Sequence, residues 1–211
     1  MEARMKTFIY IDAFNLYFGA VRGTPFKWLN LDQLCRIVLP RNDIEQIKYF
    51  TARVNARPSD PDQPTRQATY LRALATIPHL TVYCGHFLTH TVMMPLANPV
   101  SGQNPYAEVF KTEEKGSDVN LAAQLLHDAH CNRFECAVIL SGDSDLLMPL
   151  RIVKEDLHKP VGVINPQQIP CRVLEKHATF YKHIRPAALR KSQFPSPMQD
   201  AKGTFTKPSG W

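Results

Sequence analysis

Residues 6–12, KTFIYID, form an unbroken run of apolar and β-favouring residues that ends in an acid. A run without alternation between apolar and polar residues is typical of a strand buried on both faces, as in a parallel sheet. Comparable runs recur along the chain, separated by segments with helical spacing; they lie at 44–54, 80–88, 136–140, 160–164 and, in shorter form, 180–184. This alternation predicts a three-layer α/β sandwich around a mainly parallel sheet of five or six strands.

The composition is that of a folded protein outside the membrane. The chain has 211 residues, of which 44% are hydrophobic, and this fraction argues against wholesale disorder. No apolar run approaches the ~20 residues of a membrane span. The N-terminal apolar run is too short for a signal peptide, and the five cysteines show no CxxC spacing, so we expect a cytoplasmic protein. The net charge of +6 permits an acidic partner without requiring one.

The chain is expected to form one domain and a tail. Residues 1–186 carry the strand and helix patterns, whereas residues 187–211 are rich in Pro, Lys and Ser and are predicted to be largely mobile. Within the domain, residues 89–114 have no clear periodicity and contain several prolines. An irregular segment of this length predicts a functional flap or an insert.

Four acids occupy equivalent places in this layout. Asp12 ends the first strand, Asp143 and Asp145 follow the fourth, and Asp118 opens the helix that precedes the fourth. Ligands of open α/β sheets bind beyond the carboxyl ends of the strands, so we expect these acids to meet at that edge. Carboxylates gathered in this way repel one another unless a cation lies between them, and oxygen ligands suit Mg²⁺ or Mn²⁺.

Each acid except Asp12 also has an ordinary structural interpretation. Asp118 follows Ser117, a candidate N-cap, and an acid at a helix start complements the helix dipole. Asp143 is a candidate N-cap, and Asp145 a first-turn acid. The sequence offers no obvious capping role for Asp12, directly after FIYI.

Neutral and basic side chains fit the same edge. Asn15 is placed to orient a phosphate or a water, and Ser141 to donate a hydrogen bond to a carboxylate, although both residues are also common in turns. Basic residues in nearby loops and first turns are candidates for contact with a phosphate backbone, namely Arg53, Arg57, Arg66 and Lys111. Simple solvation of these charges is the alternative.

Three segments together resemble a known family. YIDAFNLYFG (10–19), EEKGSDVNLAAQLL (113–126) and VILSGDSDLLMPLRIV (138–153) resemble the three motifs of the NYN domain, in matching order and spacing. That domain belongs to the PIN-like nuclease superfamily and includes many bacterial proteins of the DUF88 type. LRKSQFP (189–195) is similar to a segment that often closes this subfamily, so the resemblance covers about residues 5–196.

The resemblance implies a Rossmann-like, PIN-like fold in which the first and fourth strands are adjacent. It implies metal-dependent RNA cleavage that leaves 5′-phosphate and 3′-hydroxyl ends. The catalytic, metal-binding acids would be Asp12, Asp118, Asp143 and Asp145. Asn15 matches the motif asparagine, and Lys115 matches a frequent lysine that is expected to contact substrate phosphate.

The chain departs from the family pattern at two positions. Many relatives carry a further acid about six residues after the position of Asp118, where this chain has Gln124. Ala13 replaces a frequent glycine after the first motif aspartate. The change at Gln124 is expected to affect the rate or the number of metal ions rather than the class of reaction.

Several other side chains offer weaker signals. Aromatic residues are candidates for stacking on unpaired bases, namely Tyr17, Phe18, Phe26, Trp28 and Tyr106. Phe18 and Trp28 are nevertheless expected in the core. His127 and Cys131 lie four residues apart on a helix, a spacing that permits one metal ion to bind both, but no further ligand pair is evident, so the end of an amphipathic helix is the preferred interpretation.

The leading prediction is a Mg²⁺- or Mn²⁺-dependent ribonuclease that hydrolyses phosphodiester bonds of single-stranded or structured RNA with a metal-activated water. One alternative is an RNA- or protein-binding module that keeps the acidic metal pocket without significant turnover, and another is a DNA nuclease. Homodimerisation is possible, since small nucleases of this kind often pair. The absence of GxxxxGK[ST] and GxGxxG motifs argues against nucleoside triphosphate and dinucleotide sites.

Overall fold

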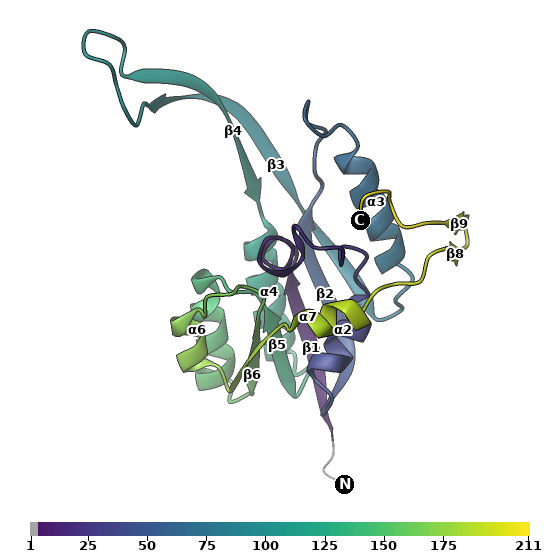
Figure 1. Ribbon diagram of the computed structural model, residues 1–211. Coiled ribbons are helices and arrows are strands. Elements are labelled where there is room, and N and C mark those ends of the chain that lie inside the picture. Colours follow the sequence, from purple (N-terminus) through teal and green to yellow (C-terminus); the bar gives the residue numbers. More distant parts are fainter. Residues whose placement is uncertain (1–3) are drawn as a thin grey trace.

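The structure, a computed structural model, describes residues 4–211 and centres on a seven-stranded sheet (Figure 1). The strand order is β4-β3-β2-β1-β5-β6-β7, and all neighbours are parallel except β3 and β4. The strands span β1 (Met5–Asp12), β2 (Asn42–Ala52), β3 (Leu80–Pro95), β4 (Tyr106–Lys115), β5 (Cys136–Leu140), β6 (Val161–Asn165) and β7 (Phe180–His183). The predicted α/β class is confirmed, and β1 lies beside β5, the strand predicted as the fourth.

Helical segments cover both faces of the sheet and complete the three layers. They are α1 (Ala13–Leu16), η1 (Tyr17–Val21), α2 (Leu31–Val38), α3 (Gln63–Leu74), α4 (Ser117–His130), η2 (Ser144–Leu146), α5 (Leu147–Arg151), η3 (Ile152–Asp156), α6 (Arg172–His177) and α7 (Pro186–Lys191). Successive residues of β1 point to opposite faces. Ile9 and Ile11 therefore join the core beneath α2 and α3, whereas Tyr10 joins Leu121 and Leu125 of α4 in the other.

The segment predicted as an irregular flap is instead a two-stranded ribbon. β3 continues to Pro95, and β4 pairs antiparallel with it from Tyr106 to Lys115. Residues 86–115, here called the arm, extend far beyond the body of the domain (Figure 1). The predicted count of five or six strands was wrong because the arm supplies a seventh. Its two faces are both largely exposed, so it lacks the periodic apolar pattern that marks a half-buried strand.

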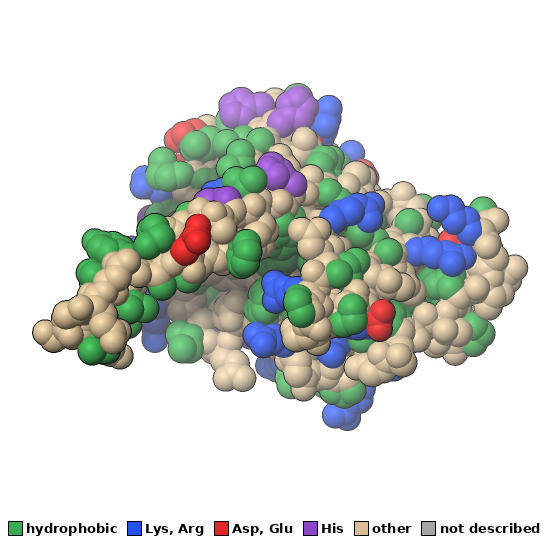
Figure 2. Space-filling view, turned by 90° about the horizontal axis from the view of Figure 1, so that it is seen from above, with side chains coloured by type: hydrophobic (Ala, Val, Ile, Leu, Met, Phe, Trp, Pro, Cys, Tyr) green, Lys and Arg blue, Asp and Glu red, His purple; other side chains and the backbone are tan. Residues whose placement is uncertain are grey.

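The arm carries large apolar side chains that water reaches. They are Leu88, Met93, Met94, Leu96, Val100, Tyr106 and Phe110. Figure 2 shows hydrophobic side chains gathered along the arm and a hollow between the arm and the body. No residue of the arm belongs to either hydrophobic core in the part of the chain that the structure describes.

Shortening the arm is therefore expected to leave the body folded. Thr89 and Thr112 face each other across the ribbon, so an Asn-Gly turn can join them in place of residues 90–111. We expect the melting temperature to change by less than about 2 °C, because the removed side chains contribute to neither core. Circular dichroism on heating measures this, and a fall of 10 °C or more would show that the arm supports the body.

The last residues pack against the domain. The sequence predicts a largely mobile tail over 187–211, but the structure forms α7 and a small hairpin of β8 (Met198–Asp200) and β9 (Gly203–Phe205) there. Leu189, Phe194 and Phe205 are buried in the core around Trp28, whose indole Nε1 donates to the carbonyl of Pro195 at 3.0 Å. Within residues 4–211, no helix is long and apolar enough to cross a membrane.

Candidate active site

Asp12 is a buried carboxylate at the carboxyl end of β1. Its side chain is 4% exposed, and each oxygen accepts one hydrogen bond: Oδ1 from the backbone N–H of Asn15 at 2.9 Å, and Oδ2 from Ser141 Oγ at 3.0 Å. Burial raises the pKa of the Asp12 carboxyl, and the two hydrogen bonds partly offset this rise. The bond to Asn15 also makes Asp12 the N-cap of α1, a role that the sequence did not reveal.

The turn after β5 places two more acids beside Asp12. Ser141 is buried, and its Oγ accepts from the backbone N–H of Asp143 at 3.1 Å while donating to Asp12. Asp143 Oδ1 in turn accepts from the backbone N–H of Asp145 at 3.0 Å and caps η2. Because β1 and β5 are neighbours, the SGDSD turn lies against the end of β1. One hydroxyl thus joins the first and third motifs.

Asp118 lies at the start of α4, as predicted, although its helix is capped differently from the prediction. Ser117 is the first helical residue, and Gly116, with φ of 100°, precedes it in a left-handed conformation that favours glycine. Glu114 satisfies the helix start, because its carboxylate accepts from the backbone N–H of Ser117 at 3.1 Å and from Ser117 Oγ at 2.7 Å. The last residues of the arm therefore hold the start of α4.

Electrostatics connects Asp118 with the other acids. Its pKa is raised to about 6, first by partial burial and then by negative charges nearby. Those charges belong to Asp12, Asp143, Glu114 and Asp145, in order of decreasing effect. The edge therefore carries the four predicted carboxylates and a fifth, Glu114, which lies in the segment predicted to be irregular and was not among the predicted site residues.

The donor set fits a hard divalent cation. Carboxylates of like charge are stabilised by a cation between them, and oxygen is the ligand that Mg²⁺ and Mn²⁺ prefer. Among residues 4–211, no three Asp, Glu, His or Cys side chains lie close enough to form a ready-made metal cage. Mg²⁺ usually keeps several waters and binds only one or two protein carboxylates.

Replacing Asp118 by Asn is expected to stabilise the protein in EDTA. Because the folded-state pKa lies above its ordinary value of 3.8, stability falls as the pH rises from 3.8 through about 6, and the cost persists above it. Solvent screens part of the repulsion, so we expect a rise in melting temperature of roughly 2–4 °C at pH 8. The control is Asp43→Asn, an exposed acid at the start of β2. A lower melting temperature for Asp118→Asn, with an unchanged control, would contradict the repulsion.

Two amides from the end of β6 extend the site beyond the sequence prediction. Asn15 Oδ1 accepts from the backbone N–H of Gly142 and from Gln167 Nε2, both at 3.0 Å. Asn165 Oδ1 accepts from the backbone N–H of Gln167 at 3.0 Å. A Cβ at Gly142 would lie 2.7 Å from Asn165 Oδ1, so a larger residue there would displace the Asn165 amide. Asn165 ends a buried strand just as Asp12 does. A polar residue at the end of an apolar run was therefore the sequence feature that could have predicted Asn165 as a site residue.

The predicted substrate-binding cations lie on exposed segments next to elements that carry the acids or border them. Lys115 ends β4 three residues before Asp118 and is exposed, with its Nζ 3.3 Å from Glu113 Oε2. Arg53 and Arg57 are exposed in the loop after β2, which is a neighbour of β1. The two other basic candidates pair elsewhere: Arg66 binds Asp60, and Lys111 binds Glu113 on the arm.

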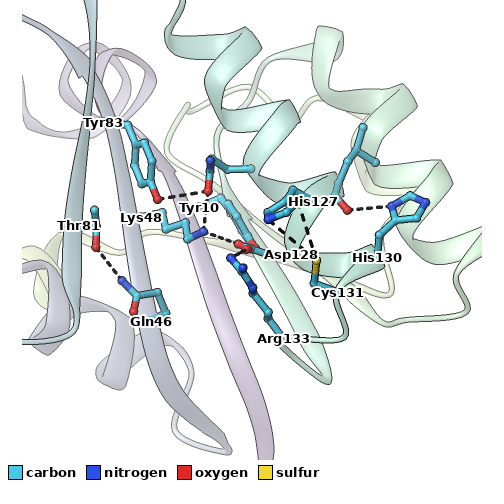
Figure 3. A network of polar contacts seen from close by, with 12 residues as sticks. Tyr10, Gln46, Lys48, Thr81, Tyr83, His127, Asp128, His130, Cys131 and Arg133 are labelled. Atoms are coloured by element: carbon cyan, nitrogen blue, oxygen red, sulfur yellow. Dashed lines mark hydrogen bonds and ion pairs between the residues drawn. The ribbon is translucent and has the colours of Figure 1, made fainter.

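Gln124 belongs to a buried network that ties α4 to the sheet (Figure 3). Its Oε1 accepts from Lys48 Nζ at 2.8 Å and from the Tyr83 hydroxyl at 3.2 Å. The same Lys48 Nζ lies 2.5 Å from Asp128 Oδ2, which also accepts from the Tyr10 hydroxyl at 2.7 Å. Gln124 thus has structural partners, and we call this set the Lys48–Asp128 network.

His127 and Cys131 lie on the exposed side of the same helix, α4. The Cys131 Sγ atom is 3.9 Å from His127 Nδ1.

Comparison with known proteins agrees with this geometry. The family model described as NYN domain matches residues 6–184. The chain belongs to the NYN domain family. That family is part of the PIN-like superfamily, so the predicted family is confirmed, and a nuclease-like fold follows from it.

Two individual proteins are similar to this NYN protein. It is 30% identical to 6-hydroxy-3-succinoylpyridine 3-monooxygenase HspA of Pseudomonas putida over 98% of this chain and 75% of that protein. The crystal structure of a protein of unknown function from Vibrio parahaemolyticus superposes with a TM-score of 0.57 at 14% identity, over 92% of this chain and 99% of the other. The second likeness concerns the fold alone.

Proposed function

We propose that this NYN protein is a metal-dependent endoribonuclease that hydrolyses phosphodiester bonds of single-stranded or structured RNA. The observation that carries the proposal is the gathering of carboxylates around Asp118, whose pKa is raised first by partial burial and then by the charges of its neighbours. A cluster that costs stability when it is ionised is typical of a site kept for function. Its place at the carboxyl edge of a parallel sheet is where such folds bind ligands.

We propose a role for each residue at this edge. Asp12, Asp118, Asp143 and Asp145 would hold Mg²⁺ or Mn²⁺, which when bound supplies a Lewis acid that lowers the pKa of water and neutralises charge on the phosphate. Ser141 and the backbone of Asn15 hold both Asp12 oxygens in place. The carboxylate of Asp145 or Asp118 would orient the attacking water by accepting a hydrogen bond from it.

Substrate binding is proposed for three exposed cations. Lys115 lies two residues before the helix that carries Asp118, and Arg53 and Arg57 follow the strand beside β1. They would contact phosphates on either side of the cleaved bond, since such contacts supply most sequence-independent affinity for nucleic acid. We also propose a cytoplasmic location, in keeping with five cysteines that all remain free thiols.

A second candidate function is oxidation of a hydroxylated pyridine. The observation that favours it is the likeness to the monooxygenase over nearly the whole chain. A monooxygenase needs molecular oxygen and an electron donor, so the test supplies 6-hydroxy-3-succinoylpyridine, air and NADH. Consumption of NADH coupled to loss of the pyridine would favour this function.

The proposed nuclease is tested by the ends of its products. Uniformly labelled RNA and DNA of the same sequence are incubated with Mn²⁺, and the fragments are treated with phosphatase and polynucleotide kinase. We expect RNA fragments with 5′-phosphate and 3′-hydroxyl ends. RNA binding without fragments would favour the binding module, and preferential cleavage of the DNA would favour the DNA nuclease.

Homodimerisation stays a prediction. β4 is an edge strand of the sheet, and the apolar side chains of the arm lie exposed beside it. Unpaired edges with exposed apolar residues favour association. Analytical ultracentrifugation of the full chain and of the chain with the Asn-Gly turn in place of residues 90–111 measures the state directly.

A further inference from the structure

A cavity of about 420 Å³ adjoins the acidic edge without including any of its acids. Two segments form it: η1, which begins within the first motif, and the loop after β6. The lining residues are Phe18, Gly19, Gln167, Gln168 and Ile169. Its volume falls in the range of ~300–1,000 Å³ that is usual for small-ligand sites.

The two segments are fitted tightly to each other. A Cβ at Gly19 would lie 2.9 Å from Gln167 Cδ and 3.0 Å from the backbone carbon of Pro166, so a larger residue would push the walls apart. Gly19 sits in η1, a π-helical turn. Such turns are rare and occur often at functional sites. The close packing of these two cavity walls therefore depends on the glycine at position 19.

Two apolar side chains that line this cavity are exposed to water. Phe18, which the sequence analysis expected in the core, is 58% exposed, and Ile169 is 82% exposed. The guanidinium of Arg22 lies 5.5 Å from the centre of the Phe18 ring and adds a positive charge beside it. A flat ligand that covers Phe18 and Ile169 would remove this apolar surface from water.

The polar wall of the cavity connects directly with the acidic site. Gln167 Nε2 donates to Asn15 Oδ1, and the backbone N–H of Asn15 donates to Asp12. These bonds hold the Gln167 amide in one orientation, and Asn15 alone connects it to Asp12. Gln168 is exposed, and its amide offers both a donor and an acceptor to the cavity.

We propose that this cavity binds the base of the nucleotide next to the cleaved phosphodiester bond. The base would stack on Phe18 and present its edge to the amides of Gln167 and Gln168, while Arg22 faces the backbone phosphate. A planar ring with donors and acceptors along its edge is the chemistry that this combination of aromatic and amide groups recognises. The inference rests on the proposed function, because it assumes that RNA reaches the acidic edge.

The test measures binding apart from cleavage. Short RNAs that carry the fluorescent base 2-aminopurine at one of several successive positions are added to the Asp143→Asn variant, with Ca²⁺ in place of Mn²⁺. We expect quenching on binding at one position of the RNA only. In the Asp143→Asn background, Phe18→Ala should abolish this quenching and weaken binding roughly 5- to 100-fold, whereas Phe18→Tyr should retain both. Val173→Ala, an exposed apolar residue on α6, is the matched control.

Each other outcome has a definite meaning. RNA that binds without position-specific quenching, or with quenching and affinity unchanged by Phe18→Ala, overturns the base pocket and leaves the nuclease proposal intact. RNA that does not bind at all overturns both. Position-specific quenching that depends on Phe18, together with a wild-type protein that does not cleave the same RNA, supports the pocket and overturns the nuclease.

Discussion

Replacing Asp12 by Asn is expected to lower the rate of RNA cleavage by a factor on the order of 10²–10³ or more, comparable to removing a group that stabilises transition-state charge. Asp12 is the most buried acid of the edge, and it touches both the first and the third motif through Asn15 and Ser141. Asn has nearly the same shape, keeps an oxygen for the Asn15 N–H and offers an amide to Ser141 Oγ. The variant should therefore fold, although it loses both the charge and the acceptor of the Ser141 hydroxyl.

The measurement is single-turnover cleavage of end-labelled RNA in Mn²⁺, with circular dichroism as a check on folding. Removing a carboxylate also removes repulsion toward phosphate, so RNA binding should be unchanged or tighter. Asp43→Asn, at the opposite edge of the sheet, should cleave like the wild type. A variant at Asp12 that keeps more than a tenth of the wild-type rate would contradict the assigned role.

Replacing Asp128 by Ala is expected to lower the free energy of unfolding by about 3–5 kcal/mol, the usual cost of leaving one charge of a buried pair alone. Asp128 is fully buried, and its carboxylate accepts from Lys48, Tyr10 and Arg133. Without it, the Lys48 ammonium keeps only the Gln124 amide as a hydrogen-bond partner in the described structure. Urea denaturation followed by fluorescence measures the change.

Two control variants distinguish the effect of breaking the ion pair from the effect of removing side-chain volume in the core. The double variant Lys48→Met with Asp128→Leu should recover most of the stability, since apolar residues of similar size often replace a buried pair without loss. Arg133→Ala should cost less than about 1 kcal/mol, because half of that side chain is exposed. If Asp128→Ala lost less than 1 kcal/mol, the Lys48–Asp128 network would not be what holds α4 on the sheet.

The sequence was most informative where strands are buried on both faces. KTFIYID and the run at 136–140 could be recognised because helices cover both sides of β1 and β5, which leaves few polar positions. The arm was missed for the opposite reason, since β4 and most of β3 have exposed residues on both faces and only local pairing holds them. Its sequence therefore resembles that of a loop.

The sequence could predict those site residues that the order of the strands alone brings together. Asp12, Asp143 and Asp145 follow neighbouring parallel strands, so their meeting follows from the order of the strands. Glu114 and Gln167 join the site through side-chain contacts from segments that carry no periodic pattern. The buried ion pair of Lys48 could not be predicted from the sequence, because its partners, Gln124 and Asp128, lie on a helix far along the chain.

The most direct test of the central claim is cleavage of end-labelled RNA by the wild type and by Asp143→Asn, each in Mn²⁺ and in EDTA. The account predicts products with the wild type in Mn²⁺ and none in the other three reactions. Equal cleavage by the variant, or cleavage by the wild type in EDTA, would contradict an active site built on the carboxylates at this edge of the sheet.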